Sequence, residues 1–195
     1  MQNLKNTYSE VKFMLIAISG TPGTGKSKTA RELTKMLDAY LVSVNSLIKK
    51  KKIRCGYDNK LKCKIIDTKS LQMAVDREKK QKTNIVESHL AHFLMADFIV
   101  ILRTNPDVLK KRLKKRKWNG KKIKENIHAE ILDEIIIETL ERHGKSKIAE
   151  IDTSIRSPKQ TASLIKKLLN NYRLQKKYRA GNIDWTKKYI RYLIK

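Results

Sequence analysis

Residues 13–37 read FMLIAISGTPGTGKSKTARELTKML, and this stretch decides the fold. It begins with a short run of apolar residues, which is typical of a strand buried on both faces of a parallel sheet. A glycine-rich loop follows at once, and then Ala30, Leu33 and Leu37 recur at helical spacing. The order strand, loop, helix predicts that a helix begins near Lys26.

The loop meets the pattern G-x-x-x-x-G-K-[ST] of a P-loop. Glycines let the backbone turn tightly and aim its N–H groups at a phosphate, and the next helix adds its positive N-terminal end. In this pattern the lysine reaches the β- and γ-phosphates and the hydroxyl binds Mg²⁺. The sequence therefore predicts a site for ATP and Mg²⁺. Its expected nucleotide-binding residues are Gly20, Gly23, Thr24, Gly25, Lys26, Ser27 and Lys28.

The rest of the chain alternates strands with helices. Further strands are expected at residues 40–44, 84–87, 98–102 and 147–151, and helices at residues 70–80, from Pro106 and from Ser157-Pro158. This alternation predicts an α/β fold in three layers, a five-stranded parallel sheet flanked by helices. Isoleucines recurring every fourth residue from Ile123 predict one long helix that reaches Leu140. Residues 47–63 are basic and are expected to be irregular.

A carboxylate is needed to complete the Mg²⁺ shell, and its natural place is the end of a neighbouring buried strand. Glu87 closes the strand NIVE, so Ser27 and Glu87 are the predicted metal-binding pair. His89 follows closely and is a candidate to donate to the phosphates or to position water. The alternative for His89 is a helix-start histidine with no role in catalysis.

Two arginines in the basic segment after the fourth strand, Arg112 and Arg116, are four residues apart and share a helical face. Both can reach phosphates as a fork, and Arg116 is predicted to stabilise charge on the transferred group. The lysines around them are expected to be solvated. The predicted catalytic residues are thus Lys26, Arg116, Glu87 and His89.

The charge balance is strongly basic, with 45 Lys and Arg against 19 Asp and Glu, a net charge of +26. Such a field attracts polyanions, so RNA or a ribosomal particle is the natural class of partner. A lysine-rich composition of the kind found in hyperthermophiles is the alternative. That enrichment usually raises Glu with Lys, and here Lys rises alone.

The cysteines and the hydropathy indicate a cytoplasmic protein. Cys55 and Cys63 form no CxxC pair, and two free thiols in a reducing compartment are expected. No run of about 18 apolar residues is present, so no membrane contact is expected. Residues 1–12 lack the apolar segment of a signal peptide.

Residues 170–195 are basic and aromatic and break at Ala180-Gly181-Asn182, which predicts an appendage of one or two short helices. Stacking aromatics among cations suit single-stranded RNA. The alternative is that the aromatic side chains dock this segment on the core. The aromatic residues concerned are Tyr172, Tyr178, Trp185, Tyr189 and Tyr192.

The strand, the loop GTPGTGKS, the segment ESH and then ILRTNPDVLKKRLKKRKWN together resemble the small adenylate kinases linked to ribosome assembly, which occur in archaea and eukaryotic nuclei. The resemblance covers roughly residues 13–141. It implies an adenylate-kinase-like fold with a short insert for the nucleoside monophosphate and a short lid. It also implies transfer of phosphate from ATP to AMP, ATPase activity and a role in maturing small-subunit rRNA in the pre-ribosome. The implied protein partner is a small-subunit ribosomal protein of the uS11 type.

Carried onto this chain, the family's phosphate contacts fall on Gly23, Gly25, Lys26, Ser27 and Lys28, its lid arginine on Arg116, and its Asp-x-His segment on Glu87 and His89. The resemblance places the insert at residues 43–66 and the lid at residues 115–125, within a core of residues 1–169.

The chain departs from the family pattern at four positions. Glu87 replaces Asp, Lys28 replaces Thr, and Ser46 and Lys49 stand where Asp and Arg are expected. Lys binds a phosphate less well in bidentate fashion than Arg, so the departures bear on AMP affinity more than on ATP binding.

Two alternative functions remain open beside the adenylate kinase. One is an ATP-switched assembly ATPase that binds RNA or the ribosome, with little transfer to AMP. The other is a P-loop kinase for a different small acceptor. A short lid also favours ATP hydrolysis, because water must be excluded for transfer to dominate.

Overall fold

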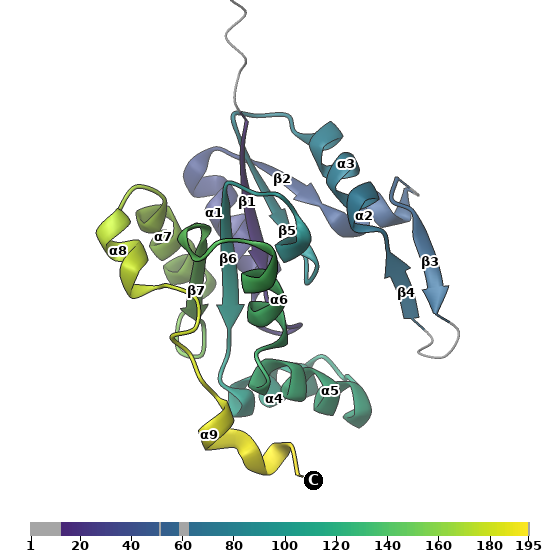
Figure 1. Ribbon diagram of the computed structural model, residues 1–195, viewed down its shortest axis with the longest axis vertical. Helices are drawn as coiled ribbons and strands as arrows, with labels where there is room; N and C mark the ends of the chain where they lie inside the picture. The colour runs from purple at the N-terminus through teal and green to yellow at the C-terminus, as the bar shows by residue number, and fades with distance from the viewer. Residues whose placement is uncertain (1–12, 51, 59–62, 195) are drawn as a thin grey trace, which may run out of the picture.

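The computed structural model describes residues 13–50, 52–58 and 63–194, and its centre is a parallel sheet between two layers of helices (Figure 1). The strands of this sheet are β1 Met14–Ser19, β2 Tyr40–Ser43, β5 Thr83–Glu87, β6 Phe98–Arg103 and β7 Ile148–Asp152. They lie in the order β2-β5-β1-β6-β7, and all four pairs are parallel. The predicted fold class is confirmed.

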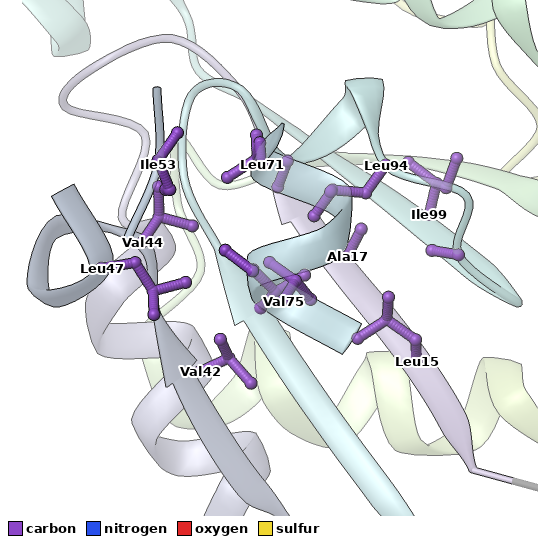
Figure 2. Packing of buried hydrophobic residues seen from close by; sticks show 14 of the residues in the cluster. Leu15, Ala17, Val42, Val44, Leu47, Ile53, Leu71, Val75, Leu94 and Ile99 are labelled. Carbon is purple, nitrogen blue, oxygen red and sulfur yellow. The ribbon is translucent and has the colours of Figure 1, made fainter. Parts of the chain in front are cut away.

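Helices cover both faces because successive side chains of each strand point to opposite faces. Ile16 and Ile18 pack with α1 Lys26–Leu37 and α7 Pro158–Leu169. Leu15 and Ala17 belong to a second cluster with α3 Thr68–Glu78 and α6 Glu134–Arg142. Figure 2 shows this second cluster, with Val75 of α3 above the strands. The side chains of these four β1 residues, 15–18, are almost completely buried.

Local capping explains two of the predicted helix starts. The Asn105 side chain accepts hydrogen bonds from the N–H groups of Asp107 and Val108, and Pro106 opens α4 Pro106–Lys115. Ser157 and Gln160 form a capping box at the start of α7. Both starts are where the sequence predicts them.

The basic stretch at residues 47–63 is more regular than predicted. It includes the second half of a short helix, α2 Val44–Lys49, which Ser43 caps by accepting from the Ser46 N–H. An antiparallel pair follows, β3 Cys55–Asp58 with β4 Cys63–Ile66. The helix has only two buried side chains, Val44 and Leu47, so no helical period stands out in the sequence.

The single long helix predicted from Ile123 to Leu140 is wrong. The chain forms α5 Gly120–Ile131 and then α6, with a break at Leu132-Asp133. Asp133 adopts a left-handed backbone conformation, with φ of 58°, and its carboxylate pairs with buried Arg103. This ion pair stabilises a break that the repeat of isoleucines does not reveal.

The C-terminal segment packs on the core at two places (Figure 1). Its first part, at Leu174 and Tyr178, lies against α7 and β7, and its last part, from Trp185 on, lies against α4 and α5. It contains α8 Tyr172–Lys177, α9 Thr186–Tyr189 and the 3-10 turn η3 Ile190–Tyr192; two further 3-10 turns are η1 Ala91–Phe93 and η2 Lys145–Lys147. Tyr189 is buried and Trp185 partly so, in a cluster with Leu109 and Ile127. These two rings hold the segment on the core and are not free to stack on bases. Within the described residues, no helix is long and apolar enough to cross a membrane.

Candidate active site

The loop after β1 has the backbone geometry of a phosphate cradle. Gly20, Gly23 and Gly25 all have φ between 100° and 136°. A Cβ on Gly20 would stand 2.3 Å from the carbonyl oxygen of Leu102, so only glycine fits between the loop and β6. Gly25 lies immediately before α1, where the N–H groups of the first turn have no partners within the helix. The cradle and the helix end both favour an anion.

Lys26 lies across this loop. Its Nζ donates to the carbonyls of Gly20 at 2.6 Å and Thr21 at 3.2 Å. Burial lowers the pKa of Lys26 to about 8, with Glu87 and Glu130 opposing the shift and Arg116 adding to it. A buried ammonium that is short of negative charge is a strong attractor for phosphate.

Ser27 and Glu87, which the sequence predicts to bind a metal, are in contact. The Ser27 hydroxyl donates to Glu87 Oε2 at 3.1 Å, which joins the start of α1 to the end of β5. β1 and β5 are parallel neighbours with Ile18 opposite Glu87, so the carboxylate stands beside the loop. A hydroxyl and a carboxylate are hard oxygen ligands of the kind Mg²⁺ takes together with phosphates and water. The residues therefore fit the ion.

His89 stands at the rim of the loop, exposed, on the turn after β5. Partial burial and the charges of Lys26 and His92 lower its pKa, so the ring is neutral at pH 7. The Ser19 hydroxyl lies 3.2 Å from the His89 carbonyl oxygen and 3.0 Å from Nδ1 of buried His92. Nε2 of His92 donates to Glu138 at 2.9 Å, so this turn is tied to both β1 and α6.

The arginines of α4 lie on the side of that helix that faces the loop. Arg112 donates to the carbonyls of Thr153, at 2.7 Å, and Gly23, at 3.5 Å, which fixes its guanidinium. Arg116 is exposed, caps the end of α4 and acts electrostatically on Lys26. Both line a cavity of about 310 Å³ that we call the loop-side cavity. Other residues that line it include Thr24, Gly25, Lys28 and Arg156.

A buried ion cluster supports the loop from behind, and sequence reasoning missed it. Arg103, at the end of β6, donates to Glu130 at 2.9 Å and to Glu150 at 2.6 Å. These carboxylates and Asp133 raise the pKa of Arg103 although burial opposes its charge. Burial raises the pKa of Glu130, while Arg103 and the side chain of Thr21 act to lower it. Glu130 thereby links the loop to the sheet.

Thr153, after β7, is a second residue that sequence reasoning missed. Its hydroxyl lies 2.9 Å from the carbonyls of both Thr24 and Arg103. A signal was available, since Asp152-Thr153-Ser154 follows an apolar strand at the edge where parallel strands place their ligands. The partners of Glu130, in contrast, lie 26 or more residues away along the chain and leave no local pattern.

The structure brings the sequence-predicted site residues together at one edge of the sheet. Lys26, Ser27, Glu87 and His89 surround the loop, and Thr24, Lys28 and Arg116 line the adjoining cavity. A phosphate cradle, the adjoining Ser27–Glu87 pair and convergent arginines at the carboxyl ends of parallel strands define a P-loop kinase.

Comparison with known proteins gives the family. The family model described as "AAA domain" matches residues 16–133. The chain is 38% identical to the "Putative adenylate kinase" of Methanocaldococcus jannaschii over 92% of this chain and 97% of that protein. Proteins of the same name in Archaeoglobus fulgidus and Thermococcus kodakarensis are 39% and 35% identical, over 88% and 90% of this chain and 92% and 95% of theirs. The chain therefore belongs to the family of these archaeal proteins named putative adenylate kinase, and it is an enzyme of the nucleoside monophosphate kinase class.

Solved structures with little sequence similarity share the fold. Shikimate kinase from Acinetobacter baumannii in complex with shikimate superposes with a TM-score of 0.54 at 12% identity, over 80% of this chain and 93% of that chain. Deoxyadenosine kinase from M. mycoides with bound dATP gives 0.52 at 15% identity, over 80% and 100%. At these identities the likeness establishes the fold and leaves the acceptor open.

Proposed function

We propose that this enzyme transfers the γ-phosphoryl group of ATP to AMP and forms two ADP. The observation that carries the proposal is the convergence of Lys26, the Ser27–Glu87 pair and Arg116 around one loop. The names of the relatives support AMP as the acceptor.

The transfer needs little covalent help from the protein. A phosphate oxygen of AMP bonds to the γ-phosphorus of ATP, and the bond from that phosphorus to the bridging oxygen breaks. Lys26 and Arg116 hold the phosphates in line and neutralise the charge that develops on the transferred group. Mg²⁺, held by Ser27 and Glu87, supplies further neutralisation when it is bound.

The loop-side cavity suits the nucleoside of ATP. It adjoins the loop at Gly25 and lies between Arg112 and Arg116 of α4 and Arg156 after β7. A guanidinium is planar and stacks on aromatic rings, so these arginines fit a purine. The acceptor AMP then belongs on the opposite side of the loop, next to the insert at residues 43–66 where Lys49 is exposed.

An assay of ADP formation tests this function. ATP and Mg²⁺ are supplied alone, with AMP, and with CMP, GMP or UMP in turn. We expect AMP to stimulate ADP production at two ADP per AMP consumed. Lys49→Ala should raise the KM for AMP with little change in that for ATP. Stimulation by another monophosphate in place of AMP would overturn the choice of acceptor, and no stimulation by any would overturn the transfer itself.

ATP hydrolysis is a proposed accompanying activity. The turn between α4 and α5 is short, which leaves little chain to close over the phosphates, and transfer to water competes where closure is incomplete. His89, neutral and close to Lys26, is the proposed residue that orients the water. If His89→Ala leaves hydrolysis unchanged while Lys26→Ala abolishes it, that role is ruled out.

A second function rests on the charge of the molecule. A net charge of +26 favours a polyanionic partner, and we propose that the enzyme acts on the maturing small ribosomal subunit and its rRNA. A small-subunit ribosomal protein of the uS11 type is the proposed protein partner. Co-sedimentation with purified small subunits, with and without ATP, tests this. If the enzyme binds the subunits equally with and without ATP, ATP does not control the binding. If it does not bind them at all, the small ribosomal subunit is not its partner.

A further inference from the structure

A second cavity lies away from the P-loop, between α4, α5 and η3. It measures about 590 Å³, and we call it the basic groove. Among the described residues that line this groove, four are lysine or arginine and none is aspartate or glutamate. Its lining includes Lys110, Lys114, Ile123, Ile127, Arg191 and Tyr192.

The floor of the groove is apolar and held in place. Ile123 and Ile127 are buried, with exposed fractions of 7% and 2%. The Tyr192 hydroxyl donates to Asp107 at 2.5 Å, and Nε2 of His128 donates to the Tyr192 carbonyl at 2.6 Å. A surface fixed at both ends costs little to order when a flat ligand lies on it.

The rim of the groove carries positive charge. The Lys110 ammonium lies 5.1 Å and the Arg191 guanidinium 5.7 Å from the centre of the Tyr192 ring, and Lys114 is exposed one helical turn beyond Lys110. Gly120 also lines the groove, so the positive end of α5 lies there. The rim therefore favours more than one negative charge.

The basic groove and the ATP site use opposite sides of α4. Residues two apart on an α-helix point about 200° apart, so Lys110 and Lys114 project away from Arg112 and Arg116. A ligand in the groove does not overlap ATP.

An apolar floor below a cationic rim fits a chain of flat bases joined by phosphates. A duplex offers only its phosphates, because its bases are already stacked and paired. A membrane surface is met by apolar side chains that project outward, whereas Ile123 and Ile127 on the floor of this groove are buried. We propose that the basic groove binds single-stranded RNA, with a base against Tyr192 above the buried Ile123 and Ile127 and the flanking phosphates on Lys110, Lys114 and Arg191. This rests on the second function above and narrows it to one surface.

Fluorescence anisotropy with a labelled 12-nucleotide single-stranded RNA tests the proposal on the full chain across a series of KCl concentrations. The groove variant is Lys114→Ala with Arg191→Ala. Its control is Lys111→Ala with Lys187→Ala, which removes the same charge from the same two segments at exposed positions outside the groove. Kinase activity and the unfolding temperature of each variant verify that it is folded.

We expect the groove variant to bind RNA at least about tenfold more weakly, and the control about twofold. The slope of log affinity against log salt should fall by about 1.4 in the groove variant, since each phosphate contact of a single strand contributes about 0.7. Equal losses in both variants, or no measurable RNA binding by the unaltered chain, would overturn the groove.

Two further measurements distinguish single-stranded RNA from the alternative ligands, duplex RNA and a membrane surface. A 12-base-pair duplex RNA bound as tightly as the single strand would mean that the floor plays no part. If the groove variant loses binding to phosphatidylserine vesicles but still binds RNA as the unaltered chain does, the groove binds a membrane surface and the RNA proposal fails. If the groove variant still co-sediments fully with small subunits, the ribosomal function stands and the groove proposal fails. RNA binding is measured without nucleotides, so it is independent of the AMP assay.

Discussion

The two sides of α4 gather positive charge by different physical means. On one side the P-loop uses backbone N–H groups, a helix end and Lys26, a lysine that burial makes reluctant to be charged. On the other side the basic groove uses exposed cations above buried isoleucines. The first arrangement is costly until a phosphate arrives, and the second is well solvated without a ligand. Net charge alone therefore does not distinguish a reaction centre from a binding surface.

The largest effect should come from the buried lysine. Lys26→Ala removes the cation next to the β- and γ-phosphates, and we expect ADP formation to fall about 10³-fold. Lys28→Ala, at an exposed neighbouring position, should change it only a few-fold. Steady-state ADP production measures both. Similar losses in the two variants would mean that the loop works through bulk charge, as the basic groove does.

Loss of the Glu87 carboxylate, the proposed metal ligand, should have the next largest effect. Glu87→Gln keeps the size of the side chain but removes the charge opposite Ser27, so we expect kcat to fall about 10²-fold. The Mg²⁺ concentration for half-maximal activity should rise as well. A titration with Mg²⁺ measures it, and an unchanged midpoint would show that Glu87 does not bind the metal.

The pH dependence of ATP affinity is a smaller effect. The pKa of Lys26 is lowered to about 8, so its side chain is protonated in the free enzyme below that pH. As the pH rises above 8, Lys26 in the ATP-free enzyme loses its positive charge. If ATP binds the protonated form, affinity should fall about tenfold between pH 7 and pH 9, with proton uptake on binding near pH 8. Calorimetry in buffers of different ionisation enthalpy measures this. The dependence should vanish in Lys26→Ala, and its persistence there would assign it to another group.

The smallest effect is expected at the turn between α4 and α5. Lys117 follows the C-cap of α4 with φ of 56°, and the Trp118 N–H donates to the Leu113 carbonyl. Glycine adopts that conformation without strain, so Lys117→Gly should raise the free energy of unfolding by about 0.5–1 kcal/mol. Lys111→Gly, within the same helix, should lower it by about 1 kcal/mol. Urea denaturation measures both, and a destabilised Lys117→Gly would contradict the strain.

The sequence predicts the sheet and the loop well because their signals are local. An apolar strand, three glycines and a helix within 25 residues identify a P-loop in a parallel sheet, and Glu87 follows from the end of a neighbouring strand. The break at Asp133 is not predictable in this way, since it depends on Arg103, 30 residues away. The basic groove likewise needs Arg191 and Tyr192 next to α4, a contact that no period in the sequence encodes.

The buried cluster at the end of β6 restricts the order in which this part of the sequence can change over generations. One guanidinium, that of Arg103, serves three carboxylates, so losing it first would leave Glu130 and Glu150 negative and buried, at a cost of about 3–5 kcal/mol. Losing Asp133 first costs less, because its side chain is 25% exposed and Arg103 keeps two partners. Viable mutational paths to a neutral cluster therefore begin at Asp133 and cannot begin at Arg103.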